Sequence, residues 1–386
     1  MKNNLLSTYA PLNVHFTRGE GCWLWDEDGN RYLDAISGLG VNILGHGHPP
    51  FIQALHAQID KLIHTSNLYI NPAQNTLAQK LSEMTGMEKA FFGVSGCEAI
   101  ECALKLARLY GHQKEIRNPS IVVFDKAYHG RTLATLTASS ERFLQAGFEP
   151  LTPGFVRAPF NDLSALEKIT ETRQDIVAVL IEPIQGQGGI RPADMTYLKA
   201  LRSLCDQKGW LLILDEIQTG LGRTGKFLCA QHAEIKPDIV ALAKGLGNGI
   251  SMGACLTRGV ANTFFTPGKH GSTFGGNPLA MHAGLAVLSE LSALNLIENV
   301  KTQGTFLFQT LKEQFQSNPQ VQEVRGQGLM IGIELSEPIP NLAKQALELG
   351  ILINVTQQKV IRLLPPLIFQ TKEVEILSEK LYSLLH

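Results

Sequence analysis

Short apolar runs that alternate with helical patterns fill the middle of this chain and limit the folds that it can adopt. We predict strands at Ala90–Val94, Ser120–Phe124, Ile176–Ile181, Trp210–Leu214, Asp238–Ala243 and Met252–Leu256. Helical patterns lie between several of these runs, for example at Cys97–Tyr110 and Met195–Lys208. Strands that are apolar along their whole length are buried on both faces, and parallel strands need crossover helices. The pattern therefore predicts an α/β fold with a mostly parallel sheet that helices cover on both sides.

The pattern changes after about residue 280. A long helical stretch covers Pro278–Leu291 and Ile297–Phe315, and two predicted strands follow at Met330–Leu335 and Ile351–Val355. The first 50 residues are rich in turns and are compatible with a short hairpin. At about 150 residues per domain, a chain of 386 residues is expected to form two or three units. We predict a large domain over residues 51–279 and a small α+β domain over residues 280–386, which residues 1–50 join.

Composition argues against several classes of protein. The chain has 34 basic and 35 acidic residues, so it lacks the basic surplus of proteins that bind nucleic acid through its phosphates. No run approaches the roughly 20 apolar residues of a membrane-spanning helix, and Met1–Ala10 lacks the apolar core of a signal peptide. The six cysteines form no Cys-x-x-Cys pair, which is typical of reduced thiols. We therefore expect a cytoplasmic protein without a nucleic-acid or membrane partner.

Polar or ionisable residues follow five of the predicted strands. In chain order they are Ser95-Gly96-Cys97-Glu98, Tyr128-His129-Gly130-Arg131, Glu182-Pro183, Asp215-Glu216-Ile217-Gln218 and Lys244. Each of them alone is compatible with an ordinary solvated strand end. In a parallel sheet, however, these ends meet at one edge, and open α/β sheets bind their ligands at that edge. The sequence therefore predicts a site there.

Ser95 and Glu98 form an S-x-x-E pattern, which is typical of a capping box at the start of a helix. The ordinary interpretation is that Ser95 only caps this helix. A second interpretation is that Gly96 lets the backbone approach an anion, so that the helix N-terminus holds a phosphate. The local pattern leaves both interpretations open.

Lys244 directly follows an apolar strand and precedes a glycine-rich segment at 245–249. A lysine in this position is usually solvated, whereas an enclosed lysine has a lowered pKa and can form a Schiff base. Asp215 ends its own strand, and a carboxylate at that depth needs a cationic partner. A phosphate-binding helix, an enclosed lysine and a buried aspartate together fit pyridoxal 5'-phosphate (PLP), because the aspartate would keep the ring nitrogen protonated.

Two further patterns have simpler explanations. Gly220–Gly225 fits G-x-G-x-x-G, but Pro237 leaves no room for the crossover helix of a dinucleotide site, and Phe227 stands where a P-loop needs Ser or Thr. We expect instead a tight glycine loop whose backbone passes near the cofactor. His46 and His48 flank one glycine without a third nearby ligand, so we interpret them as turn residues and predict no metal site.

The motifs Ser95–Ala99, Tyr128–Thr132, Glu182–Gly186, Leu214–Gly220, Lys244-Gly245 and Gly271–Pro278, in this order and spacing, resemble the class III, or ω-type, aminotransferases of PLP fold type I. The likeness runs from Tyr9 to Arg362. It implies a large domain with a mostly parallel seven-stranded sheet, a small α+β domain, PLP as the cofactor, and a homodimer with shared active sites. Gly45-His46, His64–Asn67 and Tyr128–Arg131 are most similar to the subgroup that transfers the δ-amino group of N2-acetyl-L-ornithine to 2-oxoglutarate in arginine biosynthesis.

The resemblance also implies roles around the cofactor. Lys244 and Asp215 would be the catalytic residues: Lys244 would hold PLP and shuttle the proton, and Asp215 would pair with the ring nitrogen. Gln218 would contact the ring hydroxyl, and Tyr128 would stack on the ring. The full set of implied cofactor-binding residues is Ser95, Gly96, Cys97, Tyr128, His129, Glu182, Asp215, Gln218, Lys244 and Thr273, where Gly96 and Cys97 hold the phosphate and Thr273 reaches the phosphate bound by the partner subunit.

Four residues form the implied substrate site. Arg131 would bind the α-carboxylate of acetylornithine with two hydrogen bonds, and Arg362 would bind the α-carboxylate of glutamate or 2-oxoglutarate. Ser272 would lie beside Thr273 near the substrate. Gln187 stands where a glutamate normally pairs with the arginine that matches Arg362, so we expect Arg362 to be freer for a dicarboxylate.

Three other residues depart from the subgroup. Cys97 replaces the usual threonine, which removes one hydroxyl contact to the phosphate, and Val94 and Ile100 replace asparagines, which makes the pocket rim more apolar. The sequence leaves open the ornithine, succinylornithine, succinyldiaminopimelate and 4-aminobutyrate aminotransferases as alternatives. A PLP-fold regulator without activity and a nucleotide-binding protein that uses the loop at Gly220 are weaker alternatives, and the intact Lys244, Asp215 and Arg131 argue against the regulator.

Overall fold

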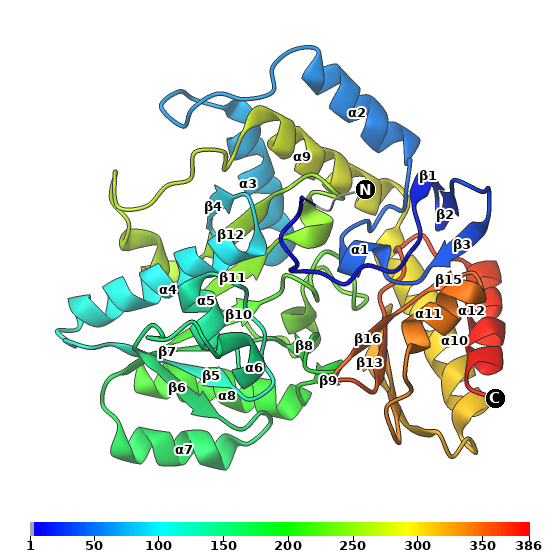
Figure 1. The fold of residues 1–386 in the computed structure, drawn as a ribbon. Helices are drawn as coiled ribbons and strands as arrows, with labels where there is room; N and C mark the ends of the chain where they lie inside the picture. The colour runs from blue at the N-terminus through cyan, green and yellow to red at the C-terminus, as the bar shows by residue number, and fades with distance from the viewer. Residues whose placement is uncertain (1–3) are drawn as a thin grey trace.

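A seven-stranded sheet lies at the centre of the computed structural model, which describes residues 4–386 (Figure 1). In spatial order its strands are β4 (Lys89–Gly93), β12 (Gly253–Thr257), β11 (Ile239–Leu242), β10 (Leu211–Asp215), β7 (Ile176–Ile181), β5 (Ser120–Phe124) and β6 (Phe155–Ala158). All of them run parallel except β12, which pairs antiparallel with both β4 and β11. The mostly parallel seven-stranded sheet is therefore confirmed.

Helices cover both faces of this sheet because successive strand residues point to opposite sides. Ile121 and Val123 of β5 belong to the buried cluster that contains α4 (Gly96–Gln113), and α5 (Leu133–Ala138) joins this face. Val122 and Phe124 belong to the larger cluster on the other face. That cluster includes side chains of α3 (Pro72–Thr85), α7 (Leu163–Thr172), α8 (Met195–Lys208) and α9 (Pro278–Ala293).

The predicted strands of the large sheet differ from the observed ones by at most one residue at either end. The prediction missed β6, which pairs only with β5 at the edge of the sheet. Its sequence is Phe155-Val156-Arg157-Ala158, and the exposed Arg157 interrupts the apolar run that identified the other strands. An edge strand is half solvated, so it carries a weaker pattern than a central strand.

A second, antiparallel sheet forms in the last third of the chain. Its strands in spatial order are β13 (Val321–Gln327), β14 (Met330–Leu335), β17 (Val360–Leu363) and β16 (Asn354–Thr356), and α10 (Leu296–Phe315), α11 (Leu342–Glu348) and α12 (Thr371–Leu384) accompany it (Figure 1). The single strand predicted at Ile351–Val355 is wrong. Residues 351–352 form β15 of a different sheet, and β16 begins at Asn354.

The N-terminal strands β1 (Phe16–Glu20), β2 (Trp23–Asp26) and β3 (Arg31–Asp34) form an antiparallel meander, which confirms the predicted hairpin. β15 (Ile351–Leu352) adds to it in parallel, with Ile351 opposite Leu33. Residues near the two ends of the chain therefore share one sheet. The division at residues 1–50, 51–279 and 280–386 stays a prediction.

The remaining elements are short connections. They are α1 (Ser37–Gly40), α2 (Pro49–Ile59), α6 (Arg142–Gln145), the hairpin of β8 (Ile184–Gln185) and β9 (Arg191–Pro192), and the 3-10 turns η1 (Cys229–His232), η2 (Lys244–Leu246) and η3 (Gly259–Thr263). In residues 4–386 no single helix has the length and hydropathy to cross a membrane; only α9 and α10 meet that test together, as a pair bent by 65°.

Candidate active site

The ends of five parallel strands meet at one edge of the large sheet, as the sequence predicts. β10 lies between β11 and β7, β5 lies beside β7, and β4 lies beyond β12, so their carboxyl ends face the same side. The residues that follow them are Ser95–Glu98, Tyr128–Arg131, Glu182, Asp215–Gln218 and Lys244. This edge is where the candidate site is built.

Asp215 and His129 form a buried pair at the centre of this edge. Nδ1 of His129 lies 2.8 Å from Oδ2 of Asp215, and both side chains are at least 95 % buried. Oδ1 of Asp215 accepts a hydrogen bond from the backbone N–H of Ile217 at 3.1 Å. Nε2 of His129 is buried and makes no hydrogen bond among the described residues. The carboxylate is therefore oriented by two donors, and the imidazole has one free nitrogen.

Lys244 comes just after β11, the strand that pairs with β10. Burial, followed by the positive charge of Arg362, lowers the pKa of its ammonium to about 8, although the charges of Asp215 and Glu182 act in the opposite direction. Its Nζ makes no hydrogen bond or ion pair within residues 4–386. A lysine with a lowered pKa supplies a neutral amine near physiological pH, which is what a nucleophile and proton carrier needs.

Glu182 joins two neighbouring segments of the site. Its Oε1 accepts from the backbone N–H of Tyr128 at 2.9 Å, and its Oε2 accepts from the backbone N–H of Gly186 at 3.0 Å. Burial raises the pKa of this carboxyl group to about 7, and His129 and the two backbone donors oppose that rise. Glu182 therefore fixes the position of Tyr128 relative to the loop that carries Gln187.

The start of α4 combines a helix cap with free backbone donors. Ser95 is the N-cap, and its Oγ accepts from the N–H of Glu98 at 3.2 Å. The predicted capping box is only half right, because Oε2 of Glu98 accepts from Val94 N–H at 2.9 Å and not from Ser95. The backbone N–H groups of Gly96 and Cys97 have no partner among the described residues, which leaves them available to an anion.

Gly96 owes its identity to packing as well. A Cβ atom at Gly96 would lie 2.7 Å from Cδ1 of Ile217, so a side chain there would push the side chain of Ile217 aside. The predicted reason, close approach of an anion, covers only part of the constraint. Sγ of Cys97 lies beside Gly130 and accepts a long hydrogen bond of 3.5 Å from the N–H of Arg131.

Tyr128, Arg131 and Gln218 flank the buried centre. The guanidinium carbon of Arg131 lies 5.7 Å from the centroid of the Tyr128 ring, and Arg131 is exposed. Gln218 keeps a buried Oε1 without a hydrogen-bond partner among the described residues. A Cβ at Gly186 would lie 2.2 Å from this oxygen, so only glycine at position 186 leaves room for the amide.

Arg362 approaches from the small sheet. It lies on β17 with 3 % of its surface exposed, and Oδ1 of Asn354 accepts from its Nε at 3.0 Å and from its Nη2 at 2.7 Å. Burial lowers the pKa of Arg362 to about 10, and Glu182 opposes this shift. The side chain of Gln187 makes no hydrogen bond in residues 4–386. Asn354 was not predicted from the sequence. Only the pairing of β16 with β17 in the structure shows that it is the partner of Arg362.

Ser272 and Thr273 lie on a different loop, between η3 and α9. Oγ of Ser272 accepts from the N–H of Gly275 at 3.2 Å, and Asn67 donates to the carbonyl of Ser272 at 3.2 Å. Thr273 is exposed and makes no hydrogen bond within residues 4–386. The structure of one chain does not bond these two residues to the Lys244 group.

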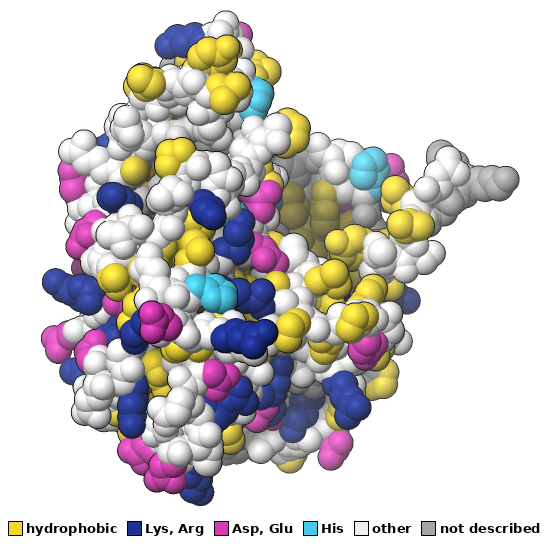
Figure 2. Space-filling model, turned by 90° about the vertical axis from the view of Figure 1, so that its left-hand side faces the viewer, with side chains coloured by type: hydrophobic (Ala, Val, Ile, Leu, Met, Phe, Trp, Pro, Cys, Tyr) yellow, Lys and Arg dark blue, Asp and Glu magenta, His cyan; other side chains and the backbone are white. Residues whose placement is uncertain are grey.

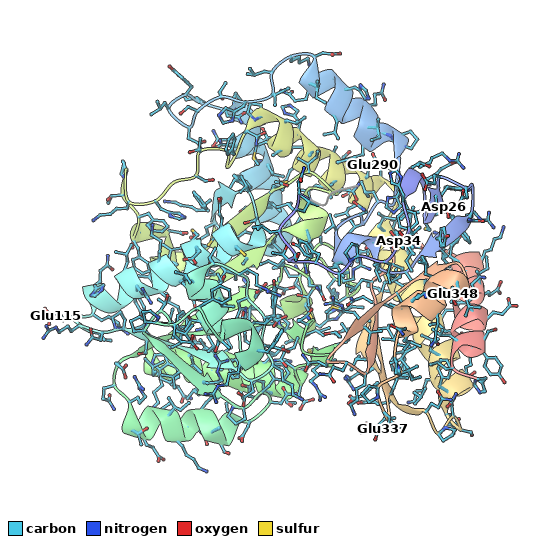
Figure 3. All side chains as sticks on the ribbon, in the orientation of Figure 1. Asp26, Asp34, Glu115, Glu290, Glu337 and Glu348 are labelled. Atoms are coloured by element: carbon cyan, nitrogen blue, oxygen red, sulfur yellow. The ribbon has the colours of Figure 1, made fainter. Side chains whose placement is uncertain are left out.

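The other patterns have structural explanations. Nε2 of His46 pairs with Asp34 and Nε2 of His48 pairs with Glu290, each at 2.8 Å (Figure 3 labels both acids). Gly222 and Gly225 pack against Ile297 and Lys301 of α10, so the expectation that this loop passes near the cofactor is wrong for them. No group of three potential metal ligands gathers among the described residues.

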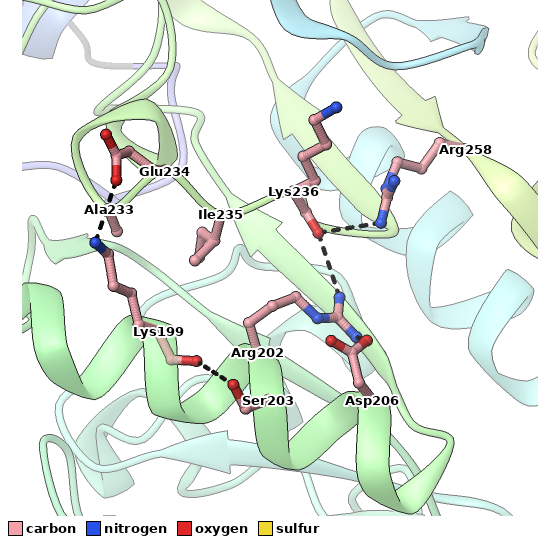
Figure 4. A pocket seen from close by; sticks show the side chains of 9 residues that line it. All are labelled: Lys199, Arg202, Ser203, Asp206, Ala233, Glu234, Ile235, Lys236 and Arg258. Carbon is pink, nitrogen blue, oxygen red and sulfur yellow. Dashed lines mark hydrogen bonds and ion pairs between the residues drawn. The ribbon is translucent and has the colours of Figure 1, made fainter.

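A surface pocket of about 430 Å³ lies at the opposite edge of the sheet (Figure 4). Its lining residues are Lys199, Arg202, Ser203 and Asp206 of α8, 233–236 before β11, and Arg258 after β12. Lys199 pairs with Glu234 at 3.3 Å, and Arg202 pairs with Asp206 at 2.7 Å. These four charged side chains are paired with one another, and the pocket is remote from the strand ends that carry Lys244.

The residues at the carboxyl edge fit PLP. The unpartnered Lys244 suits an aldehyde, the oriented carboxylate of Asp215 suits a protonated ring nitrogen, and the free Oε1 of Gln218 suits a ring hydroxyl. The free N–H groups of Gly96 and Cys97 suit a phosphate. Among the described residues, the Nζ of Lys244, the Oε1 of Gln218 and the two N–H groups have no hydrogen-bond partner, whereas Asp215 is already oriented by His129 and Ile217.

Comparison with known proteins agrees with this site. The family model of the class III aminotransferases matches residues 7–385. The acetylornithine aminotransferase of Nitrosomonas europaea is 51 % identical over 373 residues, which cover 97 % of this chain and 95 % of that protein. The enzyme of the same name from Aquifex aeolicus is 45 % identical over 372 residues, 96 % of each chain.

Solved structures show the same fold. The ornithine aminotransferase of Toxoplasma gondii, described with PLP at partial occupancy in its active site, superposes with a TM-score of 0.95 at 34 % identity, covering 99 % of this chain and 91 % of that one. An acetylornithine aminotransferase from Elizabethkingia anophelis gives 0.89 at 32 % identity, covering 99 % and 96 %. The chain therefore belongs to the class III aminotransferases, and it is a PLP-dependent transaminase of fold type I.

Proposed function

We propose that this enzyme transfers the δ-amino group of N2-acetyl-L-ornithine to 2-oxoglutarate, giving N-acetyl-L-glutamate 5-semialdehyde and L-glutamate, a step of arginine biosynthesis. The observation that carries the proposal is the presence of two arginines, Arg131 and Arg362, neither of which forms an ion pair within residues 4–386. The amino donor and the acceptor each have one α-carboxylate, which an unpaired arginine can bind. The relatives named acetylornithine aminotransferase support this choice of donor.

Bound PLP supplies an aldehyde that accepts amino groups and a ring that withdraws electrons from the reacting carbon. We assign the ring nitrogen to Asp215, which His129 and Ile217 N–H orient. The other assignments are Gln218 for the ring hydroxyl, Tyr128 for the ring face, and Ser95, Gly96 and Cys97 for the phosphate. Glu182 holds the backbone of Tyr128 in place.

Lys244 carries the proton in each half-reaction. In its neutral form, the Nζ removes a proton from the carbon that bears the amino group and returns it to the cofactor side, and the reverse order serves 2-oxoglutarate. Its lowered pKa keeps a useful fraction of this amine neutral near pH 8. Arg131 positions the α-carboxylate of the donor so that its δ-amine reaches the cofactor, and Arg362 positions the α-carboxylate of the acceptor.

We also propose that the enzyme works as a homodimer with shared sites. Large hydrophobic side chains are exposed on the loop before α3 and beside Thr273, including Leu68 at 85 %, Ile70 at 88 % and Phe274 at 63 %. Figure 2 shows hydrophobic side chains gathered near the top of one face. A patch of this kind is typical of a subunit interface, and it would bring Thr273 and Ser272 to the partner's site. A cytoplasmic location is part of the proposal and is supported by the six unpaired cysteines.

The decisive experiment is a panel of amino-donor half-reactions. The purified enzyme should be yellow, and borohydride should remove the yellow colour and leave the cofactor covalently attached to Lys244. N2-acetylornithine, ornithine, succinyldiaminopimelate and 4-aminobutyrate are each mixed with it, and the rate of bleaching is compared. We expect N2-acetylornithine to bleach fastest. A strong preference for 4-aminobutyrate would refute the donor and keep the class, and a colourless protein that ignores added PLP would refute the cofactor assignments.

A further inference from the structure

Asn354 and Arg362 are direct neighbours across two antiparallel strands. The register pairs Asn354 of β16 with Arg362 of β17, which places both side chains on one face of the sheet. A single oxygen, Oδ1 of Asn354, accepts from both Nε and Nη2 of the guanidinium at 3.0 and 2.7 Å. This contact occupies one edge of the fork and leaves the Nη1–Nη2 end for a carboxylate.

The contact orients Arg362 without neutralising it. An amide oxygen accepts the same hydrogen bonds as a carboxylate but carries no charge. Glu182, the acid whose charge acts on Arg362, uses both of its oxygens for the backbone N–H groups of Tyr128 and Gly186. No ion pair of Arg362 occurs within residues 4–386.

The strand that carries Asn354 is itself anchored to the site. Oγ1 of Thr356 donates to the carbonyl of Gln187 at 2.5 Å, and Nε2 of Gln357 donates to the same carbonyl at 3.1 Å. Gln357 also bonds to Glu141 at the start of α6. The β16–β17 hairpin is therefore fixed against the Glu182–Gln187 segment, which holds the backbone of Asn354 in place beside Arg362.

Given the proposed function, we propose that Asn354 is a positioning residue that sets the guanidinium of Arg362 for the acceptor's carboxylate while keeping its charge uncompensated. The neutral amide determines how well this enzyme binds dicarboxylates. A carboxylate in its place would hold the same fork in the same position and compete with the substrate for its charge. Acceptor binding would then weaken, whereas the donor half-reaction would change little because Arg131 serves that substrate.

The test compares Asn354→Asp, Asn354→Ala and the wild-type holoenzyme. Binding of glutarate, an unreactive five-carbon dicarboxylate, is measured by calorimetry, and the donor and acceptor half-reactions are followed by absorbance. We expect Asn354→Asp to weaken glutarate binding about tenfold or more, since hydrogen bonds between charged groups contribute that much. We expect Asn354→Ala, which loses only the orientation, to weaken it by a smaller factor of about three.

Gln358→Asp is the matched control, because Gln358 lies exposed in the same hairpin turn and makes no hydrogen bond within residues 4–386. It adds the same charge to the same hairpin, and its glutarate affinity should equal that of the wild type.

The proposal is overturned if Asn354→Asp binds glutarate as well as Gln358→Asp does, or if donor and acceptor half-reactions fall equally in both Asn354 variants. Should Asn354→Asp not fold, unchanged binding by Asn354→Ala overturns it. Failure of the donor panel in the wild type would refute the proposed substrate and leave the glutarate comparison intact.

Discussion

The two arginines that we propose to bind the substrates, Arg131 and Arg362, differ in almost every physical respect. Arg131 follows β5 in a connecting segment, is exposed, and lies over the ring of Tyr128. Arg362 lies within a strand, is 3 % exposed, and is held by Asn354 through two hydrogen bonds. Neither has an acid partner within residues 4–386, so both keep their charge for a ligand.

This difference indicates a division of labour. A buried and oriented guanidinium recognises one carboxylate geometry, which suits the acceptor in every turnover. An exposed arginine has more conformational freedom and loses more entropy on binding, so it contributes less affinity and tolerates variation in the donor. Both substrates would react at Lys244, which follows β11 at the carboxyl edge of the large sheet. The following experiments test this comparison.

Lys244→Ala should have the largest effect because, in the proposed mechanism, both arginines bring their substrates to this one amine. We expect both half-reactions to slow by at least about a thousandfold, since the proton carrier is lost. Absorbance changes of the cofactor in single turnovers measure this. Lys226→Ala, at an exposed lysine, is the control and should react like the wild type. A residual rate within tenfold of the wild type would contradict the assigned role.

Arg362→Met removes the buried side of the comparison. We expect kcat/KM for 2-oxoglutarate to fall about a hundredfold, because two charged hydrogen bonds to the carboxylate are lost. The first half-reaction with N2-acetylornithine should stay within about threefold of the wild type. Stopped-flow measurement of each half-reaction separates the two, and an equal loss in both would show that Arg362 is not specific to the acceptor.

The free-energy cost of burying the ammonium of Lys244 can be measured from the pH dependence of stability. Lys244 has a folded-state pKa of about 8, below its ordinary value of 10.5, so between these values the unfolded chain binds more protons than the folded one. Stability of the cofactor-free protein should therefore rise with pH across this window, by roughly 1–2 kcal/mol between pH 8 and 10 relative to Lys244→Met. Urea unfolding of both proteins measures it. Parallel pH profiles would mean that the ammonium is not desolvated.

Arg131→Met tests the exposed side. We expect kcat/KM for N2-acetylornithine to fall about tenfold, less than the loss from Arg362→Met for the acceptor, because water already competes for an exposed guanidinium. The 2-oxoglutarate half-reaction should change little. Steady-state kinetics with each substrate varied in turn measure both values. A larger loss from Arg131→Met than from Arg362→Met would reverse the proposed order.

Gln187→Glu should have the smallest effect. Gln187 has no side-chain partner in residues 4–386, and its backbone carbonyl is bound to the same hairpin that carries Asn354. A carboxylate here would compete for Arg362, so KM for 2-oxoglutarate should rise by a factor of about three to ten. An unchanged or lower KM would show that position 187 does not act on Arg362.

The sequence predicted the buried side of the site better than the rim. Central strands buried on both faces have continuous apolar runs, and the polar residue that ends each run is visible in the sequence, so the positions of Asp215 and Lys244 followed directly. β6 was not predicted from the sequence, because an edge strand tolerates an exposed residue such as Arg157 within its apolar run. Pairing partners that lie far apart in the chain, such as Asn354 with Arg362 or His129 with Asp215, depend on register and side-chain geometry that no local pattern contains.

Glycines show a similar limit. The sequence pattern correctly indicated that the backbone is crowded at Gly96 and in Gly220–Gly225, but it did not say by what. At Gly96 the neighbour is Ile217, and at Gly222 and Gly225 the neighbours belong to α10. A glycine-rich motif predicts close approach, and only the fold identifies the approaching group.

The pairing of β3 with β15 has a consequence for how the protein forms during synthesis. Leu33 leaves the ribosome long before its partner Ile351 is made. The strands of the large sheet all lie between them, so that sheet can assemble while the N-terminal meander still lacks its fourth strand. Contacts of such high sequence separation form late, because the entropy of closing the long loop must be overcome first. Until then the edge of β3 is an unpaired strand, open to association with other nascent chains.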